Sequence, residues 1–172
     1  VYVAQVSMGA DKNQTLKALA EAEAYPGPSL IICYAPCINH GLKIKGGMSK
    51  VQDEEKRAVD SGYWNMFRFN PLAEKKFTLD SKAPSMEYQE FLDGEVRYLS
   101  LKLKNPERAQ KLYAESAEHA KEHLAYLNKL VTLYGDQQMT KTFTIKGITD
   151  ESYYMAILGY PPTIITSDRV VR

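Results

Sequence analysis

The chain has 172 residues, of which 44% are hydrophobic and 25% are charged, a composition that supports about one folded domain and excludes disordered, collagen-like and low-complexity classes. Lys and Arg number 22 against 21 Asp and Glu, so the net charge of +1 favours neither a nucleic acid nor a membrane as partner. Two cysteines are too few for a disulfide framework and indicate a reducing, cytoplasmic location, while no apolar run reaches the ~20 residues that span a bilayer.

The first 35 residues predict a β-α-β unit at the edge of a parallel sheet. Alternating apolar residues predict a strand over 1–6, and Asp11 is placed to cap a helix that ends before Pro26. The apolar run over 29–35 is typical of a parallel strand covered on both faces. Because the sequence starts inside a strand without methionine, we expect a fragment of an α/β protein.

A mainly helical segment is predicted beyond this unit. Helices are expected over 49–60, 84–99 and 106–134, and extended pieces over 64–69 and 77–79. The charged run 53–57 is interpreted as a solvated helix face. Trp64, Phe67 and Phe69 are interpreted as core residues. The last of these helices has a 4,3-spaced stripe that predicts packing on a partner surface: Tyr113, Ala117, Ala120, Leu124, Leu127, Val131 and Tyr134.

The last residues predict a small α+β tail. A two-faced strand is expected over 140–145, a short helix over 149–158 and an extended run over 163–166. The predicted organisation is therefore a β-α-β part over 1–47, a helical extension over 48–135 and a tail over 136–172.

Cys37 is the candidate site residue because it follows the second strand, where open α/β sheets bind their ligands. Pro36 ends the strand and presents the thiol from a rigid corner. A metal ligand, a Cys37–His40 nucleophilic pair and an ordinary buried thiol are the open interpretations. A zinc site or disulfide with Cys33 is disfavoured, because four extended residues span about 13 Å, and Cys33 is expected in the core.

His119 and His123 form a second, weaker candidate. Together with Glu122 they match the pattern H-x-x-E-H of inverted zinc proteases. The match lies in a helix rich in Ala, Glu and Lys, where it arises easily by chance. We therefore expect these histidines to border the packing stripe without binding metal.

Several stretches together resemble the carboxyl-terminal part of pyruvate:ferredoxin (flavodoxin) oxidoreductases over residues 1 to about 134. The loop Ala35-Pro36-Cys37-Ile38-Asn39-His40-Gly41 is one of them. The others include Tyr2-Val3-Ala4-Gln5-Val6-Ser7-Met8-Gly9-Ala10, Gly62-Tyr63-Trp64, Phe77-Thr78-Leu79-Asp80-Ser81-Lys82 and Gly94-Glu95-Val96-Arg97-Tyr98.

The resemblance implies a fragment of the thiamine-diphosphate-binding domain of a large dimeric enzyme of anaerobic metabolism. Such an enzyme decarboxylates pyruvate oxidatively with thiamine diphosphate and Mg²⁺, transfers the acetyl group to coenzyme A and passes electrons through three 4Fe-4S clusters to ferredoxin or flavodoxin. In this family the cysteine that corresponds to Cys37 is a ligand of the cluster nearest the thiamine. A soft thiolate on a rigid strand end, followed by a loop whose amides can bond cluster sulfurs, agrees with that role.

Two departures from the family pattern limit what the resemblance implies. The Gly-Asp-Gly thiamine motif and the other cluster cysteines precede the stretch that matches residue 1, so the chain alone is expected to be inactive. Residues 139–172 match nothing in the family pattern, and an extension across the partner subunit and a foreign sequence are the open interpretations. An inactive scaffold of the same fold and a zinc hydrolase that uses His119 and His123 are the alternative functions.

Overall fold

The computed structural model describes residues 1–135, 164–166 and 169–171, within two compact units, Val1–Met139 and Thr140–Arg172. The first unit begins with β1 (Tyr2–Val6), α1 (Lys12–Ala24), β2 (Ser29–Cys33), the 3-10 helix η1 (Gly47–Lys50) and α2 (Val51–Asp60). It continues with β3 (Phe67–Phe69), β4 (Phe77–Leu79), α3 (Tyr88–Gly94), α4 (Val96–Lys104) and α5 (Pro106–Tyr134).

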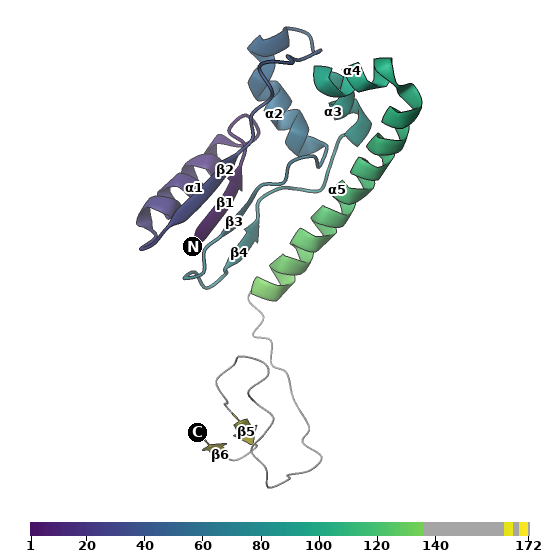
Figure 1. Ribbon diagram of the computed structural model, residues 1–172. Coiled ribbons are helices and arrows are strands. Elements are labelled where there is room, and N and C mark those ends of the chain that lie inside the picture. The colour runs from purple at the N-terminus through teal and green to yellow at the C-terminus, as the bar shows by residue number, and fades with distance from the viewer. Residues whose placement is uncertain (136–163, 167–168, 172) are drawn as a thin grey trace. The chain divides into compact units, whose positions relative to one another are not determined.

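A four-stranded mixed sheet forms the centre of the first unit, with the strand order β2-β1-β3-β4 (Figure 1). β1 and β2 are parallel and joined by α1, whose N-cap residue Asp11 accepts a hydrogen bond from the Gln14 amide at 3.0 Å. The predicted β-α-β unit is therefore confirmed. The two expected extended pieces are β3 and β4, which join the same sheet as antiparallel strands.

Helices cover the sheet from both sides. The buried residues Tyr2, Ala4 and Val6 of β1 pack with Ala18 of α1 on one face. Residues of the opposite alternation include Phe69, whose ring lies 5.5 Å from the ring of Tyr134 at the end of α5. α1 therefore covers one face, and the carboxyl-terminal end of α5 packs against the strands β3 and β4 on the other.

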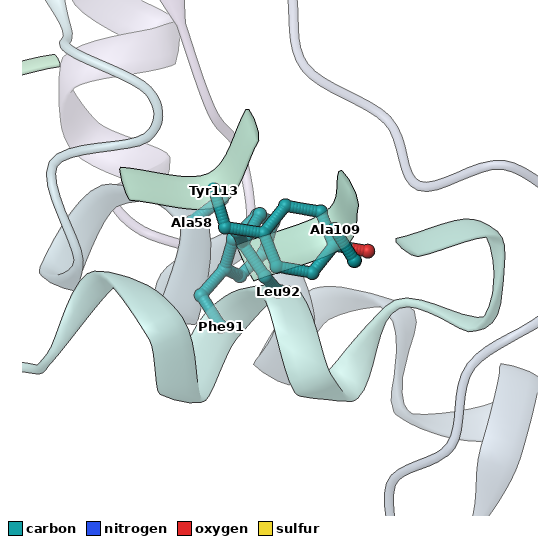
Figure 2. Close-up of a cluster of buried hydrophobic side chains, with 5 residues drawn as sticks. All are labelled: Ala58, Phe91, Leu92, Ala109 and Tyr113. Atoms are coloured by element: carbon teal, nitrogen blue, oxygen red, sulfur yellow. The ribbon is translucent and has the colours of Figure 1, made fainter. Parts of the chain in front are cut away.

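A second hydrophobic core lies beyond the carboxyl ends of β1 and β2, where α2, α3 and α5 meet (Figure 1). Its fully or nearly buried members come from these three helices and are Ala58, Phe91, Leu92, Ala109 and Tyr113 (Figure 2). Aromatic side chains surround it, and the ring of Tyr63 lies 4.6 Å from that of Phe91. This core holds the helices that surround the loop following β2.

The prediction that β2 is covered on both faces is wrong. The strand occupies the edge of the sheet and pairs only with β1, and Leu30, Ile32 and Cys33 are exposed. Cys33 is consequently not a core residue. The continuous apolar run is typical of a buried strand, but no element among the described residues covers the outer edge of β2.

Two predictions of burial hold only in part. Glu54 is 0% exposed and Glu55 is 8% exposed, although the run 53–57 was expected to be solvated. On β3, Arg68 is buried while Phe67 and Phe69 are only half-buried. Asp80 and Glu21 replace the water that the Arg68 charge otherwise requires, and the Gly9 amide donates a hydrogen bond to Glu55.

The helix expected over 84–99 is broken at Glu95. This residue has an extended backbone, with φ −92° and ψ 115°, and forms an isolated antiparallel bridge with Leu42. The break separates α3 from α4 and gives the loop after β2 a backbone partner.

The 29-residue helix α5 agrees with the prediction, and its N-cap Asn105 accepts a hydrogen bond from the Arg108 amide at 3.2 Å. Its stripe faces inward at Tyr113 and Leu127, which are buried.

In the second unit, β5 (Ile164–Thr166) and β6 (Arg169–Val171) form an antiparallel pair, and β5 confirms the expected extended run. The strand expected over 140–145 and the helix over 149–158 lie outside the described residues. Within the described ranges, no helix combines the length and hydropathy needed to cross a bilayer.

Candidate functional site

The loop that follows β2 presents Cys37 at the carboxyl end of the two parallel strands. Pro36 is buried and Cys37 is half-buried, whereas Ile38, Asn39 and His40 are exposed. The Gly41 amide donates a hydrogen bond to the Cys37 carbonyl oxygen at 3.1 Å, and Gly41 adopts a φ of +74°, which glycine tolerates without strain. Cys37 therefore lies at the start of a tight turn with a defined backbone.

Cys37 and His40 are in contact, with 3.0 Å between Sγ and Nδ1. The hydrogen bond with the His40 ring lowers the pKa of the Cys37 thiol from 9.0 to about 7, helped by the backbone amides of His40 and Asn39. At neutral pH a substantial fraction of this side chain is thiolate, the form that binds metals and attacks electrophiles. The loop therefore builds a thiolate site from one side chain, one imidazole and two amides.

The far end of this loop is held by backbone contacts between residues 42–43 and the α3–α4 junction. Leu42 bridges Glu95, and the Lys43 amide donates to the Gly94 carbonyl oxygen at 2.8 Å. The Cys37 loop is thus fixed at one end by the sheet and at the other by the second core.

Cys33 and Cys37 are both free thiols, and they differ in setting. Cys33 is an exposed residue of the ladder of β2, whereas Cys37 lies in the turn. Among the described residues, no group of three His, Cys, Asp or Glu side chains is arranged to hold a metal ion. Cys37 can accordingly supply one ligand to a metal centre whose other ligands lie outside this part of the chain.

The same geometry is compatible with a Cys-His nucleophile. Within the described chain, His40 has no hydrogen bond to a carboxylate that would orient its ring, as nucleophilic pairs commonly require. The contact therefore supports a stabilised thiolate more directly than it supports covalent catalysis.

His119 and His123 lie one turn apart on α5, and both are exposed. Glu122 is exposed beside them, and Leu124 and Leu127 face the protein. The histidines border the packing stripe at the position expected from the sequence.

Residues near the Cys37 loop that the sequence did not single out are Tyr34, Glu54 and Glu95. The Tyr34 hydroxyl donates to Glu95 Oε1 at 3.3 Å, and both glutamates are fully buried. Their sequence signal was weak: Glu54 belongs to a charged run, and Glu95 follows a glycine within a predicted helix. Only the fold brings them under one loop.

Comparisons with known proteins identify the segment to which this chain corresponds. It is 54% identical over 136 residues to a pyruvate-flavodoxin oxidoreductase of Enterobacter agglomerans, which covers 77% of this chain and 11% of the relative. Identities are 52% over 134 residues to the Klebsiella pneumoniae pyruvate-flavodoxin oxidoreductase and 51% over 134 residues to the Moorella thermoacetica pyruvate:ferredoxin oxidoreductase, each covering 76% of this chain and 11% of the relative. This chain belongs to the pyruvate:ferredoxin (flavodoxin) oxidoreductase family.

The family assignment confirms the resemblance found in the sequence. The chain spans about a tenth of the length of these relatives and is a fragment of such an oxidoreductase. The relatives are enzymes, and the chain represents a small part of them. No family model matches the chain.

Proposed function

We propose that this segment supplies Cys37 as one thiolate ligand of a 4Fe-4S cluster in a full-length enzyme that oxidises pyruvate. That enzyme would decarboxylate pyruvate with thiamine diphosphate and Mg²⁺, form acetyl-CoA and reduce ferredoxin or flavodoxin. The names of the relatives support pyruvate as substrate and these proteins as electron acceptors. The remainder of the chain and a second subunit would complete the enzyme in the cytoplasm.

The observation that carries this proposal is the lowered pKa of the Cys37 thiol on a fixed turn. Iron–sulfur clusters are bound by four thiolates in most proteins, and this chain has two cysteines. Cys37 is half-buried, bonded to His40 and free of any disulfide, which suits a ligand that must already be deprotonated. The other thiolates would come from the rest of the full-length protein.

The described residues also explain how the thiolate would be stabilised. The amides of Asn39 and His40 act on Sγ and would bond negative charge on sulfur. When bound, the cluster would supply one-electron transfer. Pro36 and Gly41 fix the position of Sγ, and the bridge from Leu42 to Glu95 keeps the loop from moving away.

The test compares Cys37→Ser with Cys33→Ser in the full-length protein. Both changes replace one sulfur by oxygen and lie four residues apart, but only Cys37 has the lowered pKa and the histidine contact. We expect Cys37→Ser to lower the iron content per chain by about one cluster or to make that iron labile, and Cys33→Ser to leave it unchanged. Equal iron content and equal retention of iron in the two variants would contradict the proposal.

A further inference from the structure

Two fully buried carboxylates lie under the loop that carries Cys37. Glu54 of α2 and Glu95 of the α3–α4 junction are each 0% exposed. Gly94 brings them together: a Cβ atom at this position would lie 2.9 Å from Glu54 Oε1 and 3.4 Å from a methyl carbon of Ile44. The missing side chain of Gly94 leaves room for the Glu54 carboxylate beside the backbone of Glu95.

The two carboxyl groups have fewer partners than two buried negative charges require. Glu95 Oε1 accepts the Tyr34 hydroxyl at 3.3 Å, but Glu95 Oε2 has no hydrogen-bond partner among the described residues. Arg57 Nε lies 3.0 Å from Glu54 Oε2, yet its N–H is not directed at that oxygen, and neither Glu54 oxygen accepts a hydrogen bond there. Because an unpartnered buried carboxylate is costly, a proton on this pair stabilises the fold.

Burial and the neighbouring charged groups shift the pKa values of both carboxyl groups. Burial raises the pKa of Glu54, and Glu95 raises it further, while Arg57 lowers it. Burial also raises the pKa of Glu95, against the lowering effects of Arg97, the Tyr34 hydrogen bond and His40. Arg57 also reaches outward to Glu90 at 3.3 Å, so its charge is shared. Burial therefore favours the protonated form of each carboxyl group more strongly than Arg57 and Arg97 favour the charged form.

The pair is coupled to the Cys37 loop by bonded contacts. Glu95 bridges Leu42, and Tyr34, which donates to Glu95, immediately follows β2. His40 contacts Cys37 Sγ at 3.0 Å and acts electrostatically on Glu95. Because His40 acts electrostatically on Glu95, charge that arrives at the Cys37–His40 contact also acts on the buried pair.

We propose that Glu54 and Glu95 form a proton-binding pair that takes up one proton when the iron–sulfur group at Cys37 gains an electron. The inference rests on the proposed function of Cys37. An O–H bond would form on a carboxylate oxygen of the pair, with the proton drawn from solvent, as the substrate is oxidised and one electron passes from it to the iron–sulfur group. The same bond breaks, and the proton returns to solvent, when the electron leaves for the acceptor protein.

The measurement is the midpoint potential of the iron–sulfur group lost in Cys37→Ser, followed by electron paramagnetic resonance in the full-length protein between pH 6 and 9. One coupled proton changes the reduction equilibrium tenfold per pH unit, or about 59 mV for a one-electron couple. We expect the potential to fall as pH rises across part of this range, and Glu95→Gln to flatten the dependence. A flat wild-type profile, or an unchanged slope in Glu95→Gln, would overturn the inference.

A second variant and a spectroscopic readout keep the test decisive if Glu95→Gln does not fold. Glu54→Gln should also flatten the profile, whereas Glu118→Gln, an exposed residue of α5 with a side chain 64% accessible, should not. Infrared difference spectra between the reduced and oxidised states should contain a carboxylic-acid C=O band that Glu54→Gln removes or shifts. A band that persists unaltered in this variant would contradict the inference.

The Cys37→Ser result separates the two failures. If Cys37→Ser leaves every iron–sulfur signal intact, the proposed function fails and the inference fails with it. If Cys37→Ser removes one signal, but that signal has a pH-independent potential in the wild type, only the inference fails.

Discussion

Arg68 places a positive charge in the middle of the sheet because acidic groups surround its guanidinium. Asp80 accepts from both Nε and Nη2 at 2.9 Å, and Glu21 of α1 accepts from Nη1. The hydrogen bonds to Asp80 and Glu21 raise the pKa of Arg68 above its ordinary value. Tyr2 donates to the same Glu21 at 3.0 Å. The network ties α1, β3 and the segment after β4 into one unit.

Arg68→Ala should destabilise the chain by about 3–5 kcal/mol, because Asp80 and Glu21 would keep their largely buried charges without the cation that neutralises them. The matched control is Lys102→Ala, which breaks an exposed pair with Asp93 and should cost less than about 1 kcal/mol. Denaturant unfolding of the 172-residue chain measures both variants. Equal losses would show that the Arg68 network is not a buried one.

Glu54 is expected to make stability depend on pH. Its pKa is raised in the folded state, so the folded chain binds more protons than the unfolded chain above the ordinary value of 4.5. Stability then falls as pH rises through that window, by about 1.4 kcal/mol for each pKa unit between the two states.

Glu54→Gln should therefore lose less stability than the wild type between pH 5 and pH 8, and thermal melting at several pH values measures the difference. Glu118→Gln, at an exposed site, serves as the control. Parallel pH profiles for wild type and Glu54→Gln would contradict a buried carboxyl group with a raised pKa.

Gly9 allows β1 and α2 to approach closely. A Cβ atom there would lie 2.3 Å from the Gln52 carbonyl oxygen and 2.8 Å from the Gln52 Cα. The Gly9 amide also donates to Glu55 Oε2 at 2.7 Å, which explains why Glu55 is nearly buried.

Gly9→Ala should cost about 3 kcal/mol, since backbone atoms cannot yield as a flexible side chain can. Gly47→Ala provides the comparison: its φ of +53° strains alanine, but the added methyl group meets nothing within 4 Å, so about 1–2 kcal/mol is expected. Denaturant unfolding compares the two. A smaller loss for Gly9→Ala than for Gly47→Ala would contradict the close packing.

Patterns of neighbouring residues predicted those helices and strands that are stabilised by contacts within the same stretch of sequence. Apolar residues predicted the strands β1 and β2. The cap at Asp11 and the stop before Pro26 predicted α1, and the 4,3-spaced stripe predicted the long helix α5. The break at Glu95 depends on its backbone bridge with Leu42. The burial of Glu54 depends on the close approach of its carboxylate to Gly94, and both contacts join residues that are far apart in the sequence. No helical period encodes such contacts.

The candidate site divides in the same way. Cys37 was predictable because its turn directly follows a strand, and His40 because it lies three residues later. Tyr34 and Glu95 were not, because they meet across 61 positions of sequence. Residues that tune a site from other elements become visible only in the fold.

For the whole molecule, the exposed edge strand β2 is consistent with a chain that spans only 11% of the length of its relatives. Leu30 is 51% exposed and Ile32 is 39% exposed. The backbone of β2 pairs with a neighbouring strand, β1, on one side only. Unpaired apolar edges promote association between chains.

The chain alone should therefore self-associate at high concentration, and Ile32→Lys should reduce that association by adding charge to the edge. Leu103→Lys is the matched control, because Leu103 is 75% exposed on α4 away from the sheet. Analytical ultracentrifugation gives the distribution of species. Equal association in Ile32→Lys and Leu103→Lys would mean that the β2 edge is not responsible.

The proposed role of Cys37 is to bind iron as a thiolate in the full-length protein. An anomalous difference map at the iron edge, from crystals of that protein grown without oxygen, tests it most directly. We predict an iron peak within bonding distance of Cys37 Sγ, in place of the His40 contact on sulfur, and none at Cys33. Iron peaks that all lie away from Cys37 Sγ in the fully loaded protein would rule out this role for Cys37.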